Sequence, residues 1–159
     1  MASDELLASL DSFFASYRSA FERRDAAAIA EHFGRTVHVA TDTSGGVQLQ
    51  WAGHAEWQDV IGQIVSRYRA LDVGRADVRT LAATALSPRL GQARVDWRLY
   101  GRAGDVLYEF TALYTLVREG GTWRIVAIAH DEVAQSVRSR AGRPAPARAR
   151  DDAGSGATG

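Results

Sequence analysis

His130 is the side chain of this sequence best suited to moving a proton, because a neutral imidazole titrates close to neutral pH. It lies near the end of a strand-forming run of residues that follows a glycine pair. A two-residue turn at that pair places His130 beside Thr111 and close to Asp96 or Glu109, where a carboxylate fixes the imidazole tautomer and raises its basicity. The alternative is a partly exposed histidine at a strand end with no chemical role.

Two pairs of polar residues are expected to face each other across neighbouring strands. A hairpin whose loop covers residues 101–106 places Arg98 opposite Glu109 and Asp96 opposite Thr111. One interpretation is that these carboxylates take part in proton transfer. The other is a cross-strand salt bridge without a catalytic role.

The composition excludes several kinds of enzyme. All 19 basic residues are arginine, and the chain has no lysine, asparagine or cysteine. It therefore has no Schiff-base lysine, thiol nucleophile, disulfide or thiolate metal site. The histidines lack metal-ligand spacings such as H-x-H or H-E-x-x-H, and no G-x-S-x-G motif is present. We expect neither a metal nor a cofactor.

The spacing of apolar residues predicts helices mainly in the first half of the chain and strands mainly in the second. Leu10, Phe14 and Phe21, for example, share one face of a helix, and Gly34 is expected to end the second helix in the left-handed conformation. The predicted order is helix, helix, strand, strand, helix and four strands, over residues 4–23, 26–33, 36–42, 47–51, 54–70, 73–86, 90–100, 107–118 and 122–131.

We expect one α+β domain over residues 1–137 and a tail over residues 138–159. The tail is rich in arginine, alanine, proline and glycine and has almost no large apolar residue, which predicts disorder. No apolar run approaches the ~18 residues of a membrane helix, and the amino terminus lacks a basic signal region. Basic residues of the domain are dispersed among acidic ones. A cytoplasmic protein that binds neither nucleic acid nor membranes is therefore expected.

Two stretches of the sequence resemble the nuclear transport factor 2-like superfamily, in particular its SnoaL-like and ketosteroid isomerase-like branches. The stretches are Phe13-Phe14-Ala15-Ser16-Tyr17 through Arg24-Asp25 to Ala30-Glu31-His32-Phe33, and Gly121-Thr122-Trp123-Arg124-Ile125-Val126. The resemblance implies an α+β cone, in which a curved antiparallel β-sheet packs against three helices from the N-terminal half and a pocket opens at the wide end. Because this fold hosts many reactions and also non-catalytic dimer modules, the resemblance does not name a reaction.

The resemblance also implies which face of the sheet lines the pocket. Aligned on Phe33 and the closing Trp-Arg-Ile stretch, the cavity-facing positions are Leu113, Thr115 and Ile128. The polar residues that then face inward are Asp96, Arg98, Glu109, Thr111 and His130. The apolar residues left on the outer face are Trp97, Phe110, Tyr114 and Leu116. An outer apolar patch of this kind predicts a homodimer.

Tyr17 matches the first-helix tyrosine that donates to the substrate oxygen in ketosteroid isomerase-like enzymes, or else it is a core aromatic whose hydroxyl binds backbone. The family's base aspartate aligns with Thr41, one residue from Asp42, and its second oxyanion acid aligns with Leu113. Both departures count against an isomerase. Trp57 lies on the apolar stripe of the third predicted helix and is expected in the core or the pocket wall.

The expected function is binding of a small, largely apolar, oxygen-bearing molecule, with cofactor-free acid–base chemistry such as isomerisation, cyclisation, dehydration or hydration. The expected catalytic residues are His130, Asp96, Glu109 and Tyr17. The expected substrate-binding residues are Asp42, Trp57, Arg98, Thr111, Leu113 and Ile128. Asp96, Arg98 and Glu109 are similar, in reversed order, to the acid and arginine group of the epoxide hydrolase branch. The alternative function is a non-catalytic, homodimerising accessory module with a vestigial pocket.

Overall fold

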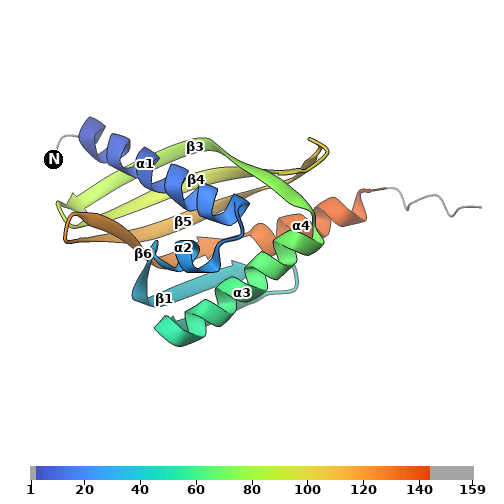
Figure 1. Cartoon of the computed structure of the whole chain (residues 1–159), viewed down its shortest axis with the longest axis horizontal. Helices are drawn as coiled ribbons and strands as arrows, with labels where there is room; N and C mark the ends of the chain where they lie inside the picture. Colours follow the sequence, from blue (N-terminus) through green and yellow to red (C-terminus); the bar gives the residue numbers. More distant parts are fainter. Residues whose placement is uncertain (1–2, 144–159) are drawn as a thin grey trace, which may run out of the picture.

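The computed structural model describes residues 3–143, which form four helices and a six-stranded sheet (Figure 1). The helices are α1 (Ser3–Glu22), α2 (Ala26–Ala30), α3 (His54–Ala70) and α4 (Glu132–Ala141). The strands are β1 (Phe33–Asp42), β2 (Val47–Gly53), β3 (Val73–Ser87), β4 (Leu90–Gly101), β5 (Val106–Glu119) and β6 (Thr122–His130). The α+β class and the order of the nine predicted elements are confirmed, and α4 is the element that the sequence pattern missed.

The strands lie in the order β2-β1-β6-β5-β4-β3, and every neighbouring pair is antiparallel except β1 and β6, which are parallel. Gly34 belongs to β1 and does not end a helix as expected. A Cβ at this position would lie 2.9 Å from a methyl carbon of Val126, so glycine is needed for the close approach of β1 to β6.

The helices cover one face of the curved sheet (Figure 1). α1 packs against β3, α3 against β1 and β2, and α4 against β5 and β1. The apolar stripe of α1 meets aromatic side chains of the sheet: the ring of Phe14 lies 4.9 Å from that of Tyr114 and 6.3 Å from that of Trp97. Such contacts remove the apolar stripe of an amphipathic helix from water.

The predicted orientation of the sheet is wrong, because its aromatic face is the one that packs on the helices. Trp97, Tyr114 and Leu116 are 3%, 4% and 0% exposed, and Phe110 packs against the same core. The homodimer surface predicted on these residues is therefore not on the outside. Side chains alternate along a strand, so the residues expected to face inward lie on the outer face instead: Asp96, Arg98, Glu109, Thr111, Leu113 and Thr115.

The pairing of β4 with β5 follows the prediction, with Arg98 opposite Glu109 and Asp96 opposite Thr111. The glycine turn between β5 and β6 also forms, but the register then shifts at an irregularity near Thr115. His130 consequently lies opposite Ala112 and not opposite Thr111. This shift turns the end of β6 over, so that His130 faces the helices.

α4 continues beyond the boundary expected at residue 137, as far as Ala141. It was not predicted because its buried side chains, Glu132, Ala134 and Ser136, are small or polar and give no large apolar stripe. The Ser139 hydroxyl donates to the carbonyl of Leu107 and ties the helix to β5. Residues 144–159, most of the tail expected to be disordered, lie outside the described residues.

Candidate functional site

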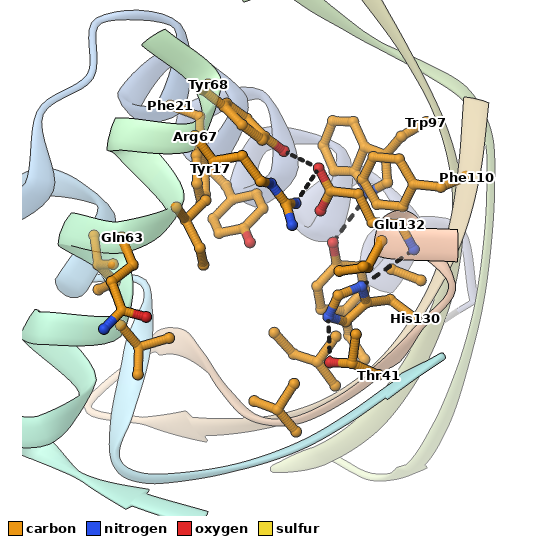
Figure 2. Close-up of a pocket in the computed structure, with 18 of the residues that line it drawn as sticks. Tyr17, Phe21, Thr41, Gln63, Arg67, Tyr68, Trp97, Phe110, His130 and Glu132 are labelled. Atoms are coloured by element: carbon orange, nitrogen blue, oxygen red, sulfur yellow. Dashed lines mark hydrogen bonds and ion pairs between the residues drawn. The ribbon is translucent and has the colours of Figure 1, made fainter. Parts of the chain in front are cut away.

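A cavity of about 340 Å³ lies between the helices and the inner face of the sheet. Its walls are mainly apolar and aromatic, with Phe21 and Ile61 on the helix side and Phe110 and Ile128 on the sheet side. Polar side chains enter from α3, β1, β6 and the first residue of α4 (Figure 2). An apolar cavity with a few converging polar groups is typical of a small-molecule site.

Glu132, the first residue of α4, carries the carboxylate of this cavity and is 7% exposed. Its Oε1 atom accepts a hydrogen bond from the hydroxyl of Tyr68 at 2.7 Å and lies 3.1 Å from Nη2 of Arg67 (Figure 2). The same atom accepts a hydrogen bond from the hydroxyl of Tyr108 at 2.9 Å. Its Oε2 atom makes no hydrogen bond within residues 3–143. One oxygen is therefore saturated while the other is available to a ligand.

The surroundings of Glu132 stay in their hydrogen-bonding states at neutral pH. Burial, reinforced by the Glu132 carboxylate, raises the pKa of Tyr68 and of Tyr108, so both phenols remain protonated donors. Burial lowers the pKa of Arg67, but Glu132 together with Tyr108 and Tyr68 more than offsets this, and the net shift is upward. Arg67 thus remains a cation that holds the carboxylate in place.

His130 lies beside Glu132 and is joined to Thr41 of β1. The backbone N–H of Glu132 donates to Nδ1 of His130 at 3.4 Å, while Nε2 lies 3.1 Å from the Thr41 hydroxyl oxygen (Figure 2). Burial lowers the pKa of His130, so the ring is neutral at pH 7. Because Nδ1 accepts, the ring proton belongs on Nε2 and is donated to Thr41. The hydroxyl proton of Thr41 is then free to point elsewhere.

Tyr17 of α1 reaches the same cavity and lies in a group of aromatic rings. Its ring is 6.2 Å from Tyr114 and 6.1 Å from Trp97, whose indole N–H donates to the Tyr114 hydroxyl at 3.0 Å. Burial raises the pKa of Tyr17 well above its ordinary value, and Tyr114 and Glu132 raise it further. Tyr17 is therefore a hydrogen-bond donor at neutral pH and not a base.

The family model described as "NTF2-like protein (DUF6841)" matches residues 4–133 of the sequence. The chain belongs to this NTF2-like family. The match covers α1 to β6 and ends just after Glu132, so the polar end of the cavity lies within it. No curated protein matches the sequence.

Solved structures share the fold of this NTF2-like chain at low identity. Aln2 from a Streptomyces species is 16% identical with a TM-score of 0.66, covering 90% of this chain and 99% of that one. An NTF2-like protein of unknown function from Pseudomonas putida is 13% identical with a TM-score of 0.64, covering 82% and 89%. A protein provisionally named as an aromatic ring hydroxylase, from Novosphingobium aromaticivorans, is 16% identical with a TM-score of 0.58, covering 82% and 91%.

Four of the ten predicted site residues line the cavity of this NTF2-like chain, namely Tyr17, Trp57, Ile128 and His130. The other six do not line it: Asp42, Asp96, Arg98, Glu109, Thr111 and Leu113. Apart from Asp42, these lie on the outer face of the sheet, because the face of β4 and β5 that packs on the helices is the aromatic one.

The outer-face polar residues and Asp42 have local partners that account for them. Hydrogen bonds from Thr111 and Thr80 lower the pKa of Asp96, and Arg98 forms an ion pair with Glu109. Asp42 ends β1 and accepts from the backbone N–H of the turn residue that follows Thr43 at 2.9 Å. These contacts hold strands and a turn together.

Glu132 and Arg67 form an ion pair in the cavity, and the sequence reasoning selected neither of them. The sequence does give an indication of Arg67. It lies three residues after Ile64 on the apolar stripe of α3, where a charged side chain is not expected unless it has a partner. The sequence gives no indication of Glu132, because it lies beyond the last predicted strand, in a segment without apolar periodicity. Its position follows only from the helix that it begins.

The described residues also bear on metals and membranes. No three acidic or histidine side chains within residues 3–143 are grouped so that they could hold a metal ion. None of the helices α1 to α4 is long and apolar enough to cross a membrane.

Proposed function

We propose that this NTF2-like protein binds a small, largely apolar molecule bearing an oxygen function and catalyses a cofactor-independent acid–base reaction on it. The reaction type is isomerisation, cyclisation, dehydration or hydration. The observation that carries the proposal is the Glu132 carboxylate, whose Oε1 is saturated by three donors while its Oε2 remains available in an otherwise apolar cavity. A carboxylate held away from bulk water beside a ligand can accept a proton.

The proposal gives different tasks to the polar side chains of the cavity. Glu132 Oε2 accepts a proton from the ligand. The hydroxyls of Thr41 and Tyr17 donate hydrogen bonds to the ligand oxygen as it becomes negative. His130, which is neutral at pH 7, orients Thr41 through Nε2. Trp57 and Ile128 supply apolar wall.

The binding part of the proposal is tested first by native mass spectrometry of the purified protein, which reports any retained ligand. The second test uses 2-naphthol, a flat apolar molecule with one hydroxyl that becomes strongly acidic on excitation. With protein in excess, naphtholate emission from the bound probe is expected, because Glu132 Oε2 accepts the proton. Ile64→Trp, which fills the cavity, is expected to abolish binding, and Leu86→Trp on the exposed end of β3 is the control.

The catalytic part is tested with Glu132→Gln, which keeps the shape of the side chain. This variant is expected to bind 2-naphthol and to emit only from the neutral form. Glu109→Gln is the matched control, because Glu109 is also paired with an arginine but lies on the outer face. Failure of 2-naphthol to bind, or naphtholate emission that survives in Glu132→Gln, contradicts the proposal.

A second candidate function is homodimerisation as an accessory module, and an observation on the outer face of the sheet favours it. Leu49, Trp51 and Leu113 are 82%, 70% and 52% exposed and line a groove of about 800 Å³ together with Ala127 and Ala129. Apolar patches of this kind commonly mark interaction surfaces. The proposed surface therefore differs from the buried aromatic face that the sequence pattern indicated.

Analytical ultracentrifugation of the full-length protein tests this second candidate. A dimer that Leu113→Arg dissociates, and that Leu86→Arg outside the groove leaves intact, supports it. A monomer at all concentrations removes it. Ligand binding in the cavity is compatible with either assembly, so the two candidate functions are tested separately.

A further inference from the structure

Three neighbouring strands place a row of polar side chains along one wall of the cavity. Gln48 of β2 is the register partner of Thr41 in β1, and Thr41 is the partner of His130 in β6. All three line the cavity. Because neighbouring strands are about 4.8 Å apart, Gln48 lies one strand spacing beyond the Thr41–His130 pair.

A second amide approaches the cavity from α3, which packs against β2. Gln63 lies four residues before Arg67, so the two share one face of the helix, and both line the cavity (Figure 2). Neither the Gln63 amide nor the Gln48 amide hydrogen-bonds to another residue in the described part of the chain. Two neutral amides with free donors and acceptors therefore line the cavity, Gln48 beside Thr41 on the sheet and Gln63 on the α3 side (Figure 2).

We propose that Gln48, assisted by Gln63, determines specificity for a second, uncharged hydrogen-bonding group of the ligand. This group lies about one strand spacing from the ligand oxygen that meets Thr41 and Glu132. The inference rests on the proposed function, since it takes Thr41 and Glu132 as the place where the reacting oxygen is held. It adds the chemical class of the ligand: a flat apolar body with two polar groups along one edge.

The charges around the cavity favour an uncharged second group. Arg67 is paired with Glu132 at 3.1 Å, and Arg18, which also lines the cavity, is paired with Asp77 at 3.7 Å. Glu132 balances the charge of Arg67, whose Nε–H has no partner within residues 3–143, and Glu132 Oε2 repels a ligand anion at this end of the cavity. A glutamine amide both donates and accepts, so it suits a hydroxyl, a carbonyl or an amide. A site built to hydrogen-bond such a group discriminates against ligands that lack it.

A ligand pair and a variant pair together test the inference by fluorescence titration. 1,3-Dihydroxynaphthalene has two hydroxyls about one strand spacing apart, whereas 2-naphthol has one. The wild-type protein is expected to bind the diol about five-fold more tightly than 2-naphthol, as one added hydrogen bond gives. 2,6-Dihydroxynaphthalene, whose second hydroxyl lies across the ring system, is expected to bind no more tightly than 2-naphthol. 3-Hydroxy-1-naphthoate, which carries a negative charge at the second position, is expected to bind more weakly than the diol.

Gln48→Leu is expected to remove the five-fold preference for the diol over 2-naphthol. Gln63→Leu is expected to reduce the preference in the same direction. Gln92→Leu, an exposed glutamine on the outer face of β4, is the matched control and keeps the preference. Because all three glutamines are exposed, these variants are expected to fold, which circular dichroism checks.

The outcomes separate this inference from the proposed function. If 2-naphthol binds but the diol binds no better, or if the preference survives in Gln48→Leu, the inference is wrong and the proposed function stands. If the naphthoate binds more tightly than the diol, the second group is an anion and the inference is also wrong. If neither 2-naphthol nor the diol binds, the proposed function fails and this inference fails with it.

Discussion

The Glu132 carboxylate and the Arg67 guanidinium lie 3.1 Å apart, although Glu132 begins α4 and Arg67 lies in the last turn of α3. The pair therefore joins the helix that follows the sheet to a helix from the middle of the chain. It also supplies the charged groups at the polar end of the cavity. Fold and candidate site depend on the same contact, because removing either partner leaves a largely buried charge without compensation.

Glu132→Gln is expected to lower the free energy of unfolding by about 2 kcal/mol. This loss is smaller than that expected for a fully buried ion pair, because the Arg67 side chain is 29% exposed. The amide oxygen of the introduced glutamine also still accepts hydrogen bonds from the two tyrosines. Glu109→Gln, which breaks an outer-face pair, is expected to cost less than about 0.5 kcal/mol. Urea denaturation at pH 7 measures both. Equal losses in the two variants contradict the assigned burial of the Glu132 pair.

Two leucines of β5 distinguish the two faces of the sheet. Leu116 is fully buried, and Leu116→Ala is expected to cost about 3 kcal/mol, since it opens a cavity in the core. Leu113, three residues away, is 52% exposed, and Leu113→Ala is expected to cost less than about 1 kcal/mol. Urea denaturation of the two variants under identical conditions gives the comparison. A larger loss from Leu113→Ala means that the outer face of β5 is buried in solution.

The sequence predicts most of the fold because the elements are strongly patterned. α1 and α3 carry clear apolar stripes, and the strand bounds follow from turns at Gly120-Gly121 and between β3 and β4. The pairing of Arg98 with Glu109 also follows, since hairpin geometry fixes register over a short distance. α4 does not follow, because its buried residues are Glu132, Ala134 and Ser136, and no apolar period marks them.

Part of the candidate site could not be predicted from the sequence, for a different reason. A shift of one residue near Thr115 decides whether the end of β6 faces outward or inward, and nothing in the alternation of apolar residues there fixes its position. His130 and Ile128 line the cavity, whereas Asp96 and Glu109 do not, because β4 and β5 present their aromatic face to the helices. The aromatic stripe of α1 packs against the aromatic face of the sheet. This packing sets the orientation of the sheet, which the family alignment predicted wrongly.

The buried tyrosines give a prediction that is independent of any ligand. Burial raises the pKa of Tyr17, Tyr68, Tyr108 and Tyr114, so these phenols are expected to stay protonated in the folded protein at pH 11. Their phenolate absorbance at 295 nm is expected only when alkali unfolds the chain, which circular dichroism follows in the same sample. Ionisation of more than one tyrosine at pH 11 before unfolding contradicts the closed packing around Glu132.

His130 makes stability depend on pH. Burial lowers its pKa in the folded protein below the value of about 6.5 in the unfolded chain, so between these two values the unfolded chain binds more protons. The contribution of His130 to stability is fully present above pH 6.5 and is lost as the pH falls through the folded pKa, by at most about 1.4 kcal/mol per pH unit. His32 behaves in the same direction, because burial lowers its pKa as well, and the two must be separated by variants.

The experiment compares the free energy of unfolding at pH 7.5 and pH 5.0 in the wild type, in His130→Gln and in His54→Gln. His32 and the carboxylates remote from His130 contribute equally to all three, so their effects cancel in the differences, whereas Glu132 and Asp131 interact with His130 and belong to its own contribution. His130→Gln is expected to lose less stability on acidification than the wild type, since glutamine cannot be protonated, and His54→Gln makes the same substitution at an exposed histidine as the control. A wild-type slope in His130→Gln means that His130 is already open to water and protonated as in the unfolded chain, and it then cannot orient Thr41 as the proposed chemistry requires.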